Sequence, residues 1–174
     1  MALLINRKTF CLGILLLCCN YSWANSSHNI FVMTLSILSY AKWNTPSPEL
    51  CVADNPNYAT QFSNYAKSNK SSFSVNAIHA TDLKSRHCDA VFFSNITAQA
   101  EQTLIDKSLN STILSLNSTI LSFSSNNAEC EIGSVFCLST NKTGNTIFKV
   151  NLDSLARSKI HVDPRVLLLA KNSD

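Results

Sequence analysis

The chain has 174 residues, the size of one ordinary domain, and 45% of them are hydrophobic, which is enough to build a buried core. Its formal net charge is +3 without any block of like charges, which gives no support for binding to nucleic acid or to an anionic membrane surface. It has only three glycines, and none of them begins a G-x-G-x-x-G motif or a P-loop, so the usual nucleotide-dependent enzymes are disfavoured.

The N-terminal residues have the pattern of a secretory signal peptide. A basic pair, Arg7 and Lys8, precedes an apolar run at 10–19 that is too short to cross a membrane as a helix. Small residues at Ser22 and Ala24 then mark a cleavage point. A membrane anchor or a lipoprotein is disfavoured, because polar residues end the apolar run and bulky residues precede its cysteines. We predict a signal peptide at 1–24 and a secreted domain at 25–174, which does not insert into the membrane after cleavage.

Cleavage leaves four of the seven cysteines: Cys51, Cys88, Cys130 and Cys137. An even number in a secreted domain predicts two disulfides, for which three pairings are possible. Proximity favours Cys130–Cys137, which leaves Cys51–Cys88; closing these loops would contribute about 2.5 and about 4 kcal/mol, respectively. A zinc site is the alternative, but no C-x-x-C or histidine pair has ligand spacing. We therefore predict no metal and no other cofactor.

The hydrophobic pattern predicts strands that alternate with helices. Phe31, Leu35 and Leu38 recur at helical spacing, whereas Phe73, Val75 and Ala77 alternate as in a half-buried strand. This alternation predicts one α/β domain with a largely parallel sheet flanked by helices. Predicted helices lie at 30–43, 57–67 and 97–109, with a helical turn at 81–83, and predicted strands at 48–53, 73–78 and 88–93.

The remaining part contains a direct repeat, 110–116 followed by 117–123. A shift of seven residues would place the apolar residues of the two copies on opposite faces of one strand, so we expect one copy to be the strand and the other a loop or extension. Strands at 134–138 and 146–151 are expected to pair antiparallel. Two short helices follow, one capped by Asn151, with Asp153 and Arg157 four residues apart, and one capped by Asp163 with Pro164 first.

No catalytic pattern is evident. His87 lies beside Cys88, but neighbours in a strand point to opposite faces, and in an oxidising compartment a disulfide is the expected state of the cysteine. There is no G-x-S-x-G elbow and no paired acid and base, so we predict that the protein is not an enzyme.

Several segments together resemble the YfiR family of small bacterial periplasmic proteins, over about 30–170. They are Leu-Ser-Tyr-Ala-Lys-Trp at 38–43, Leu-Cys-Val at 50–52, Cys-Asp-Ala-Val-Phe-Phe at 88–93, Cys-x-Ile-Gly-Ser-x-Phe-Cys-Leu at 130–138, Phe-x-Val-Asn-Leu-Asp at 148–153, Arg-Ser at 157–158 and Pro-x-Val-Leu at 164–167. The family often has Ser-Gly-Val-Arg where this chain has Ser-Lys-Ile-His at 158–161. Loss of that glycine would alter a helix end that adopts positive φ.

The resemblance implies a compact α/β fold, the disulfides Cys51–Cys88 and Cys130–Cys137, and a tendency to form a homodimer. It also implies a repressor that binds the periplasmic sensor region of a YfiN-type membrane diguanylate cyclase. Repression would lower cyclic-di-GMP signalling and so affect biofilm formation and motility, and a YfiB-type outer-membrane lipoprotein would draw the repressor away.

Five residues are the predicted partner-binding surface: Phe136, Val166 and Leu167 first, then Tyr40 and Trp43. Two other functions stay open. One is a redox sensor in which Cys130–Cys137 is the labile disulfide, and the other is a periplasmic module that binds a small ligand at the edge of the sheet.

Overall fold

The computed structural model describes residues 29–110 and 119–171 and contains a six-stranded sheet. Its strands are β1 (Glu49–Ala53), β2 (Ser74–Ile78), β3 (Ala90–Phe93), β4 (Leu121–Ser124), β5 (Phe136–Thr140) and β6 (Thr146–Val150). The strand order is β2-β1-β3-β4-β5-β6; the first five strands run parallel, and β6 is antiparallel to β5. The predicted α/β class with a largely parallel, helix-flanked sheet is confirmed.

The helices are α1 (Ile30–Ser39), α2 (Pro56–Ser68), the 3₁₀ turn η1 (Ala80–Lys84), α3 (Ala98–Leu109), α4 (Leu152–Ser158) and α5 (Pro164–Lys171). Helices α4 and α5 begin directly after the cap residues that the sequence predicts. Asn151 Oδ1 accepts the N–H of Ser154 at 2.9 Å, and Asp163 Oδ1 accepts the N–H of Arg165 at 2.9 Å, so both predicted caps are confirmed.

The first helix is shorter than its hydrophobic pattern predicts. It ends at Ser39 because the next residues pair with the C-terminal segment instead. Ala41 forms a β-bridge with Val162, and the Lys42 N–H donates to the His161 carbonyl at 2.8 Å.

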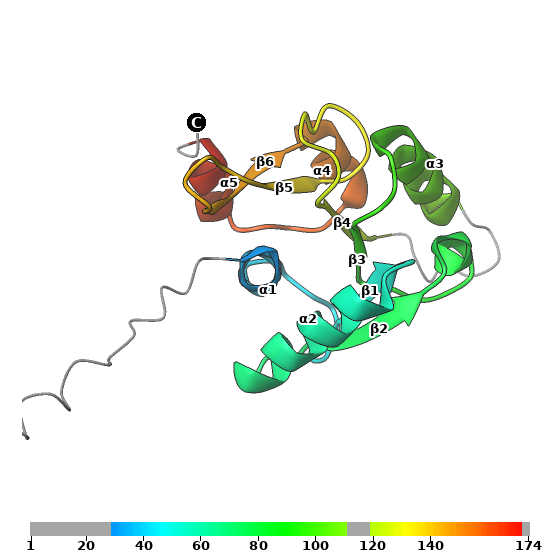
Figure 1. Ribbon diagram of the computed structural model, residues 1–174. Helices are drawn as coiled ribbons and strands as arrows, with labels where there is room; N and C mark the ends of the chain where they lie inside the picture. Colours follow the sequence, from blue (N-terminus) through cyan, green and yellow to red (C-terminus); the bar gives the residue numbers. More distant parts are fainter. Residues whose placement is uncertain (1–28, 111–118, 172–174) are drawn as a thin grey trace, which may run out of the picture.

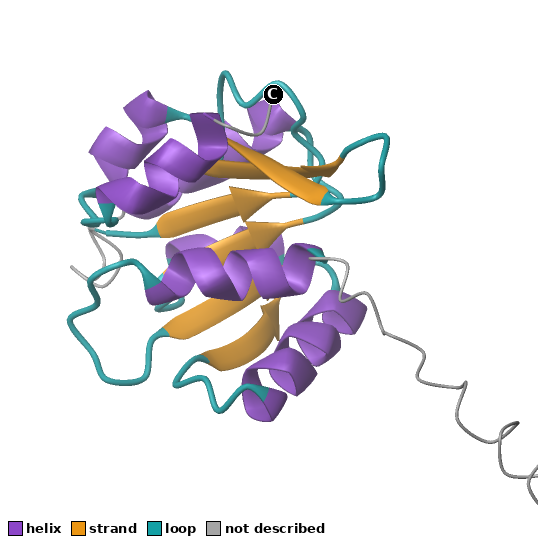
Figure 2. Cartoon of the chain, turned by 90° about the vertical axis from the view of Figure 1, so that its left-hand side faces the viewer, coloured by secondary structure: helices purple, strands orange, loops and turns teal. Residues whose placement is uncertain are grey.

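Alternate residues of each strand face opposite sides of the sheet, and each side is covered by its own helices. Leu50 and Val52 face the larger core, which contains residues of α1, α2 and α5, whereas Cys51 and Ala53 face a second core with η1 and α3. Figure 1 shows α1 and α5 on one side of the sheet and α3 on the other, and Figure 2 looks onto the α1 side.

Aromatic rings fill the larger core. Phe31 of α1 packs edge-to-face on Phe62 of α2, with ring centroids 4.8 Å apart, and Phe62 packs on Phe92 of β3 at 4.9 Å. Burying each such ring contributes about 1.5–3 kcal/mol. The contacts therefore hold both helices on the sheet.

Both disulfides pair as predicted, Cys51–Cys88 and Cys130–Cys137. The first joins β1 to the residues that precede β3, and the second joins the loop after β4 to β5. Strand β4 comes from the second copy of the repeat. Residues 111–116 of the first copy and the predicted signal peptide at 1–24 lie outside the described residues.

Candidate partner-binding surface

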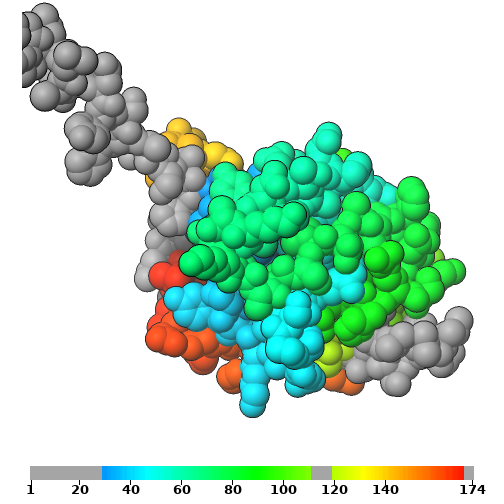
Figure 3. Space-filling view, turned by 90° about the horizontal axis from the view of Figure 1, so that it is seen from below, coloured from blue at the N-terminus to red at the C-terminus, as the bar shows by residue number. Residues whose placement is uncertain are grey.

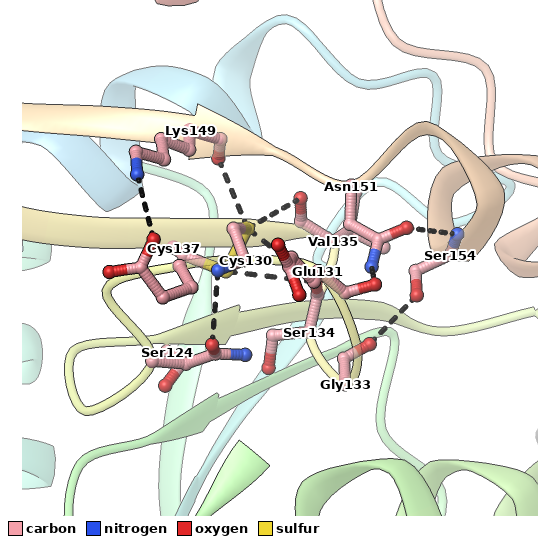
Figure 4. Close-up of a disulfide and its surroundings, with 12 residues drawn as sticks. Ser124, Cys130, Glu131, Gly133, Ser134, Val135, Cys137, Lys149, Asn151 and Ser154 are labelled. Atoms are coloured by element: carbon pink, nitrogen blue, oxygen red, sulfur yellow. Dashed lines mark hydrogen bonds and ion pairs between the residues drawn. A yellow bond between two sulfur atoms is a disulfide. The ribbon is translucent and has the colours of Figure 1, made fainter. Parts of the chain in front are cut away.

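The loop between β4 and β5 is held in a fixed shape by its own side chains and by a disulfide. Asn127 bridges it: Oδ1 accepts the N–H of Cys130 at 3.1 Å, and Nδ2 donates to the carbonyl of Ile132 at 2.7 Å. Cys130 takes a left-handed conformation with φ 59° and is joined to Cys137 on β5. Figure 4 shows this disulfide between the loop and the strand.

A buried carboxylate ties the same loop to α3. Glu101 is 0% exposed. Its Oε1 accepts the hydroxyl of Ser124 at 2.5 Å, and its Oε2 accepts the hydroxyl of Ser134 at 2.9 Å and the backbone N–H of Ser134 at 3.3 Å. Asn127 Nδ2 is a further, longer donor to Oε2 at 3.4 Å. These donors replace the water that the carboxylate loses.

Burial raises the pKa of Glu101 above its ordinary value, and the hydrogen bonds from Ser124, Ser134 and Asn127 offset only part of that rise. None of the ion pairs among the described residues includes this side chain. The carboxylate is therefore held by neutral donors alone. Loss of any one of these donors would leave part of the buried carboxylate without a hydrogen bond.

Gly133 lies against this carboxylate. Its φ is +85°, a conformation that other residues rarely adopt, and an added Cβ would lie 2.9 Å from both Ala98 O and Glu101 Oε2. Its N–H donates to Gln102 Oε1 at 2.9 Å. The close approach of the loop to α3 thus requires glycine at this position.

The short helix α4 is locked onto the other side of the loop. Asn151 Nδ2 donates to the carbonyl of Glu131 at 2.9 Å, and the Ser154 hydroxyl donates to the carbonyl of Gly133 at 2.8 Å (Figure 4). Arg157 Nη1 then reaches Asp106 Oδ1 on α3 at 3.0 Å. Arg157 therefore joins two helices, and no ion pair is found with Asp153, the partner expected from their spacing in the sequence.

A groove of about 510 Å³ lies beside this interlocked region. It is lined by residues of the loop, β6, α4 and α5: Glu129, Cys130, Lys149, Val150, Leu152, Leu167 and Ala170. Glu129 and Lys149 form an ion pair at 3.6 Å across exposed side chains. The groove thus combines an apolar lining with one charged pair.

One exposed leucine lines the groove: Leu152 is 63% exposed. Two more, Leu168 and Leu169, lie in the sequence between the lining residues Leu167 and Ala170 of α5 and are 62% and 58% exposed. Helix α5 turns Val166 into the core, so the following leucines cannot all reach it. Clustered exposed apolar side chains of this kind mark interaction surfaces.

A model of the YfiR/HmsC-like family matches residues 31–171, which is most of the chain. The chain belongs to the YfiR/HmsC-like family. The resemblance seen in the sequence is thereby confirmed, and the matched residues include the disulfide-linked loop and α4.

The five predicted surface residues of the YfiR/HmsC-like domain do not lie together. Leu167 lines the groove, but Phe136 and Val166 are 0% and 2% exposed, so a surface position is wrong for these two. Phe136 stacks on Phe123 in the neighbouring strand, 5.2 Å between ring centroids. Both predictions failed because apolar character does not show which way a side chain points. The alternation of side chains along β5 directs Phe136 into the core, and the helical period of α5 does the same for Val166.

The other two predicted residues lie on a separate part of the surface. Tyr40 is 43% exposed, with the Arg165 guanidinium 5.8 Å from its ring centroid. Trp43 is half-buried; its Nε1 donates to the Leu38 carbonyl at 2.9 Å and its ring packs on Phe73. Neither residue lines the groove, so Tyr40 and Trp43 are a candidate surface separate from it.

Sequence reasoning missed Leu152 and Glu101. Leu152 directly follows a cap residue, a position where an apolar side chain has no preceding helical turn to cover it. Among residues 29–110 and 119–171, no cluster of three or more metal-ligating side chains is found, and no helix there is both long and apolar enough to span a membrane.

Proposed function

We propose that this protein is a periplasmic regulator that binds the periplasmic sensor region of a YfiN-type membrane diguanylate cyclase and represses it. Membership of the YfiR/HmsC-like family supports this role. The observation that carries it is the groove beside α4 and α5, whose apolar lining includes the exposed Leu152.

Repression by binding requires a difference in affinity. The protein can shift the cyclase toward an inactive state only if it binds that state more tightly than the active one. A tenfold difference corresponds to about 1.4 kcal/mol, which is less than the burial of one leucine contributes. A partner helix or loop that contacts the groove in only one state of the cyclase would suffice.

The scaffold suits such a role because the groove is built on constrained elements. Cys130 belongs to a disulfide, Leu152 begins a helix fixed by Asn151, and Leu167 lies next to the buried Val166. A preorganised surface loses little conformational entropy on binding. A YfiB-type lipoprotein that bound the same groove would release the cyclase by competition.

Titration calorimetry with the disulfide-intact mature chain, 25–174, and the periplasmic region of the cognate cyclase tests the proposal. Leu152→Ser should weaken binding about 10- to 100-fold, because Leu152 lines the groove and about 1.5–3 kcal/mol of apolar burial is lost. The Leu152 side chain is 63% exposed, so the fold should be retained.

Tyr40→Ser is the matched control, since Tyr40 is also an exposed apolar residue but does not line the groove. It should change affinity by less than about threefold, in keeping with contacts outside an interface. A strong effect of Tyr40→Ser with none for Leu152→Ser would move the surface to Tyr40 and Trp43. No binding by folded wild-type protein would contradict the function itself.

One observation favours a redox-sensing variant of this function: Cys130 is both a lining residue of the groove and half of a disulfide. A dithiol reductant that converted Cys130–Cys137 to two thiols would release the loop and alter the groove. Replacing both cysteines by alanine should then make cyclase binding insensitive to reductant, whereas an unchanged response would exclude this disulfide as the sensor.

A further inference from the structure

A second hollow lies at the end of the sheet where the parallel strands begin. It has a volume of about 220 Å³ and shares no lining residue with the leucine groove. Its polar lining comes from segments before β1, β3 and β4 and after α4: Lys42, Asn44, Asp89, Thr119, Lys159 and His161. We refer to it as the basic recess.

The basic recess concentrates positive charge. Lys42, Lys159 and His161 all line it, and none of them forms an ion pair among the described residues. Opposite charges within a few ångströms would normally neutralise such a group. Two lysines beside one small volume therefore leave positive charge that no ion pair matches.

The single acidic residue of the recess is engaged elsewhere. Asp89 Oδ2 accepts the backbone N–H of Glu49 at 2.8 Å and lies 3.5 Å from His87 Nε2. The nearby Asp163 is paired with Arg165, whose Nη2 is 2.6 Å from its Oδ2. Among the described residues, neither carboxylate forms an ion pair with Lys42 or Lys159. Two lysines against Asp89 leave the recess a formal charge of +1.

The backbone brings the basic residues together. The Lys42 N–H donates to the His161 carbonyl at 2.8 Å, beside the β-bridge between Ala41 and Val162. Figure 3 shows the blue-to-cyan segment that follows α1 beside the orange-to-red C-terminal segment. The backbone positions of Lys42 and His161 are thus fixed relative to each other without a ligand.

Lys159 occupies a backbone position that glycine would fill with less strain. It ends α4 with φ 57°, in the left-handed region. The lysine at this position places a cation in the recess at a cost to the fold. Non-glycine residues held in this conformation are concentrated at functional sites.

We propose that the basic recess is an oxyanion site that takes a phosphate group. Lys42 and Lys159 supply charge-assisted donors, and Asn44, Thr119 and His161 supply further hydrogen-bonding groups. Free phosphate and the phosphate of a lipid head group present the same chemistry, and the test below separates them. The site does not depend on the regulatory function proposed above.

The test compares two lysine-to-glycine changes in the oxidised mature chain at low ionic strength. Lys159→Gly removes a cation from the recess and relieves its left-handed backbone, so the melting temperature should stay the same or rise. Lys70→Gly is the matched control: Lys70 has φ 52°, is exposed and does not line the recess. Both variants lose the same charge.

Inorganic phosphate is titrated by calorimetry, and vesicles of phosphatidylglycerol or of neutral phosphatidylcholine are tested by co-sedimentation. We expect Lys159→Gly to weaken binding about tenfold, as for the loss of one charge-assisted hydrogen bond, and Lys70→Gly to leave it unchanged. Phosphate binding without vesicle retention identifies the free anion. Retention on phosphatidylglycerol alone identifies a lipid head group.

Two results would overturn the proposal. Equal weakening by Lys159→Gly and Lys70→Gly would show that net charge, and no site, attracts the anion. Failure of the wild-type protein to bind either phosphate or phosphatidylglycerol would leave Lys42 and Lys159 as cations that only compensate the C-terminal ends of α1 and α4.

Discussion

Replacing Gly133 by alanine tests how tightly the disulfide-linked loop is pressed against α3. The change forces a Cβ into a residue with φ +85°, which costs about 1–2 kcal/mol. The Cβ would also lie 2.9 Å from Ala98 O and from Glu101 Oε2. Neither atom yields easily, since one is backbone and the other accepts several buried hydrogen bonds, and such overpacking costs a further ~1–3 kcal/mol.

Alanine lowers the conformational entropy of the unfolded chain, which offsets about 0.4–1 kcal/mol. The net loss in the free energy of unfolding should therefore be about 1–4.5 kcal/mol, centred on about 3 kcal/mol, which lowers the melting temperature by about 6–12 °C. Urea unfolding followed by circular dichroism measures the loss.

Gly144→Ala is the matched control, because Gly144 has φ +84° but no atom within 4 Å of an added Cβ. It should cost no more than about 1 kcal/mol, which is the backbone contribution alone. Equal losses for the two variants would refute the contact between the loop and Glu101 as a source of stability.

Three further predictions concern ionisation and cross-linking. The pKa of Glu101 is raised above 4.5 in the folded state, so wild-type stability relative to Glu101→Gln should increase as pH is lowered toward 4.5; a constant difference in thermal scans would contradict this. The pKa of Asp163 is lowered from 3.8 to about 2, chiefly by hydrogen bonds from Arg165, so the advantage of wild type over Asp163→Asn should be present above pH 3.8 and disappear as pH falls toward 2. Replacing Cys51 and Cys88 by alanine should lower the free energy of unfolding, measured in urea, by about 4 kcal/mol. This loss should exceed that from replacing Cys130 and Cys137, because the Cys51–Cys88 disulfide closes the longer loop; the reverse order would refute the entropic explanation.

The order of helices and strands could be predicted from the sequence because local patterns determine it. Asn151 and Asp163 cap helices, and the alternation of Phe73, Val75 and Ala77 predicts a half-buried strand, which the structure has as β2 (Ser74–Ile78). The end of α1 could not be predicted in this way. It is set by the pairing of Ala41 with Val162, residues that are distant in the sequence.

The candidate surface was predicted less well, because it too depends on contacts between residues that are distant in the sequence. Exposure depends on which face of an element meets the core, and apolar character alone does not report it: Phe136 is buried, whereas Leu168 is exposed. The buried position of Glu101 could not be predicted either, since its partners Ser124 and Ser134 come from distant segments. Three-dimensional packing alone brings these groups together.

The most direct test of the regulatory account is the cellular level of cyclic-di-GMP in four strains: wild type, a deletion of this protein, a deletion of the YfiN-type cyclase, and the double deletion. The account predicts that losing this protein raises cyclic-di-GMP when the cyclase is present and has no effect when it is absent. A rise that persists in the strain without the cyclase would contradict the account.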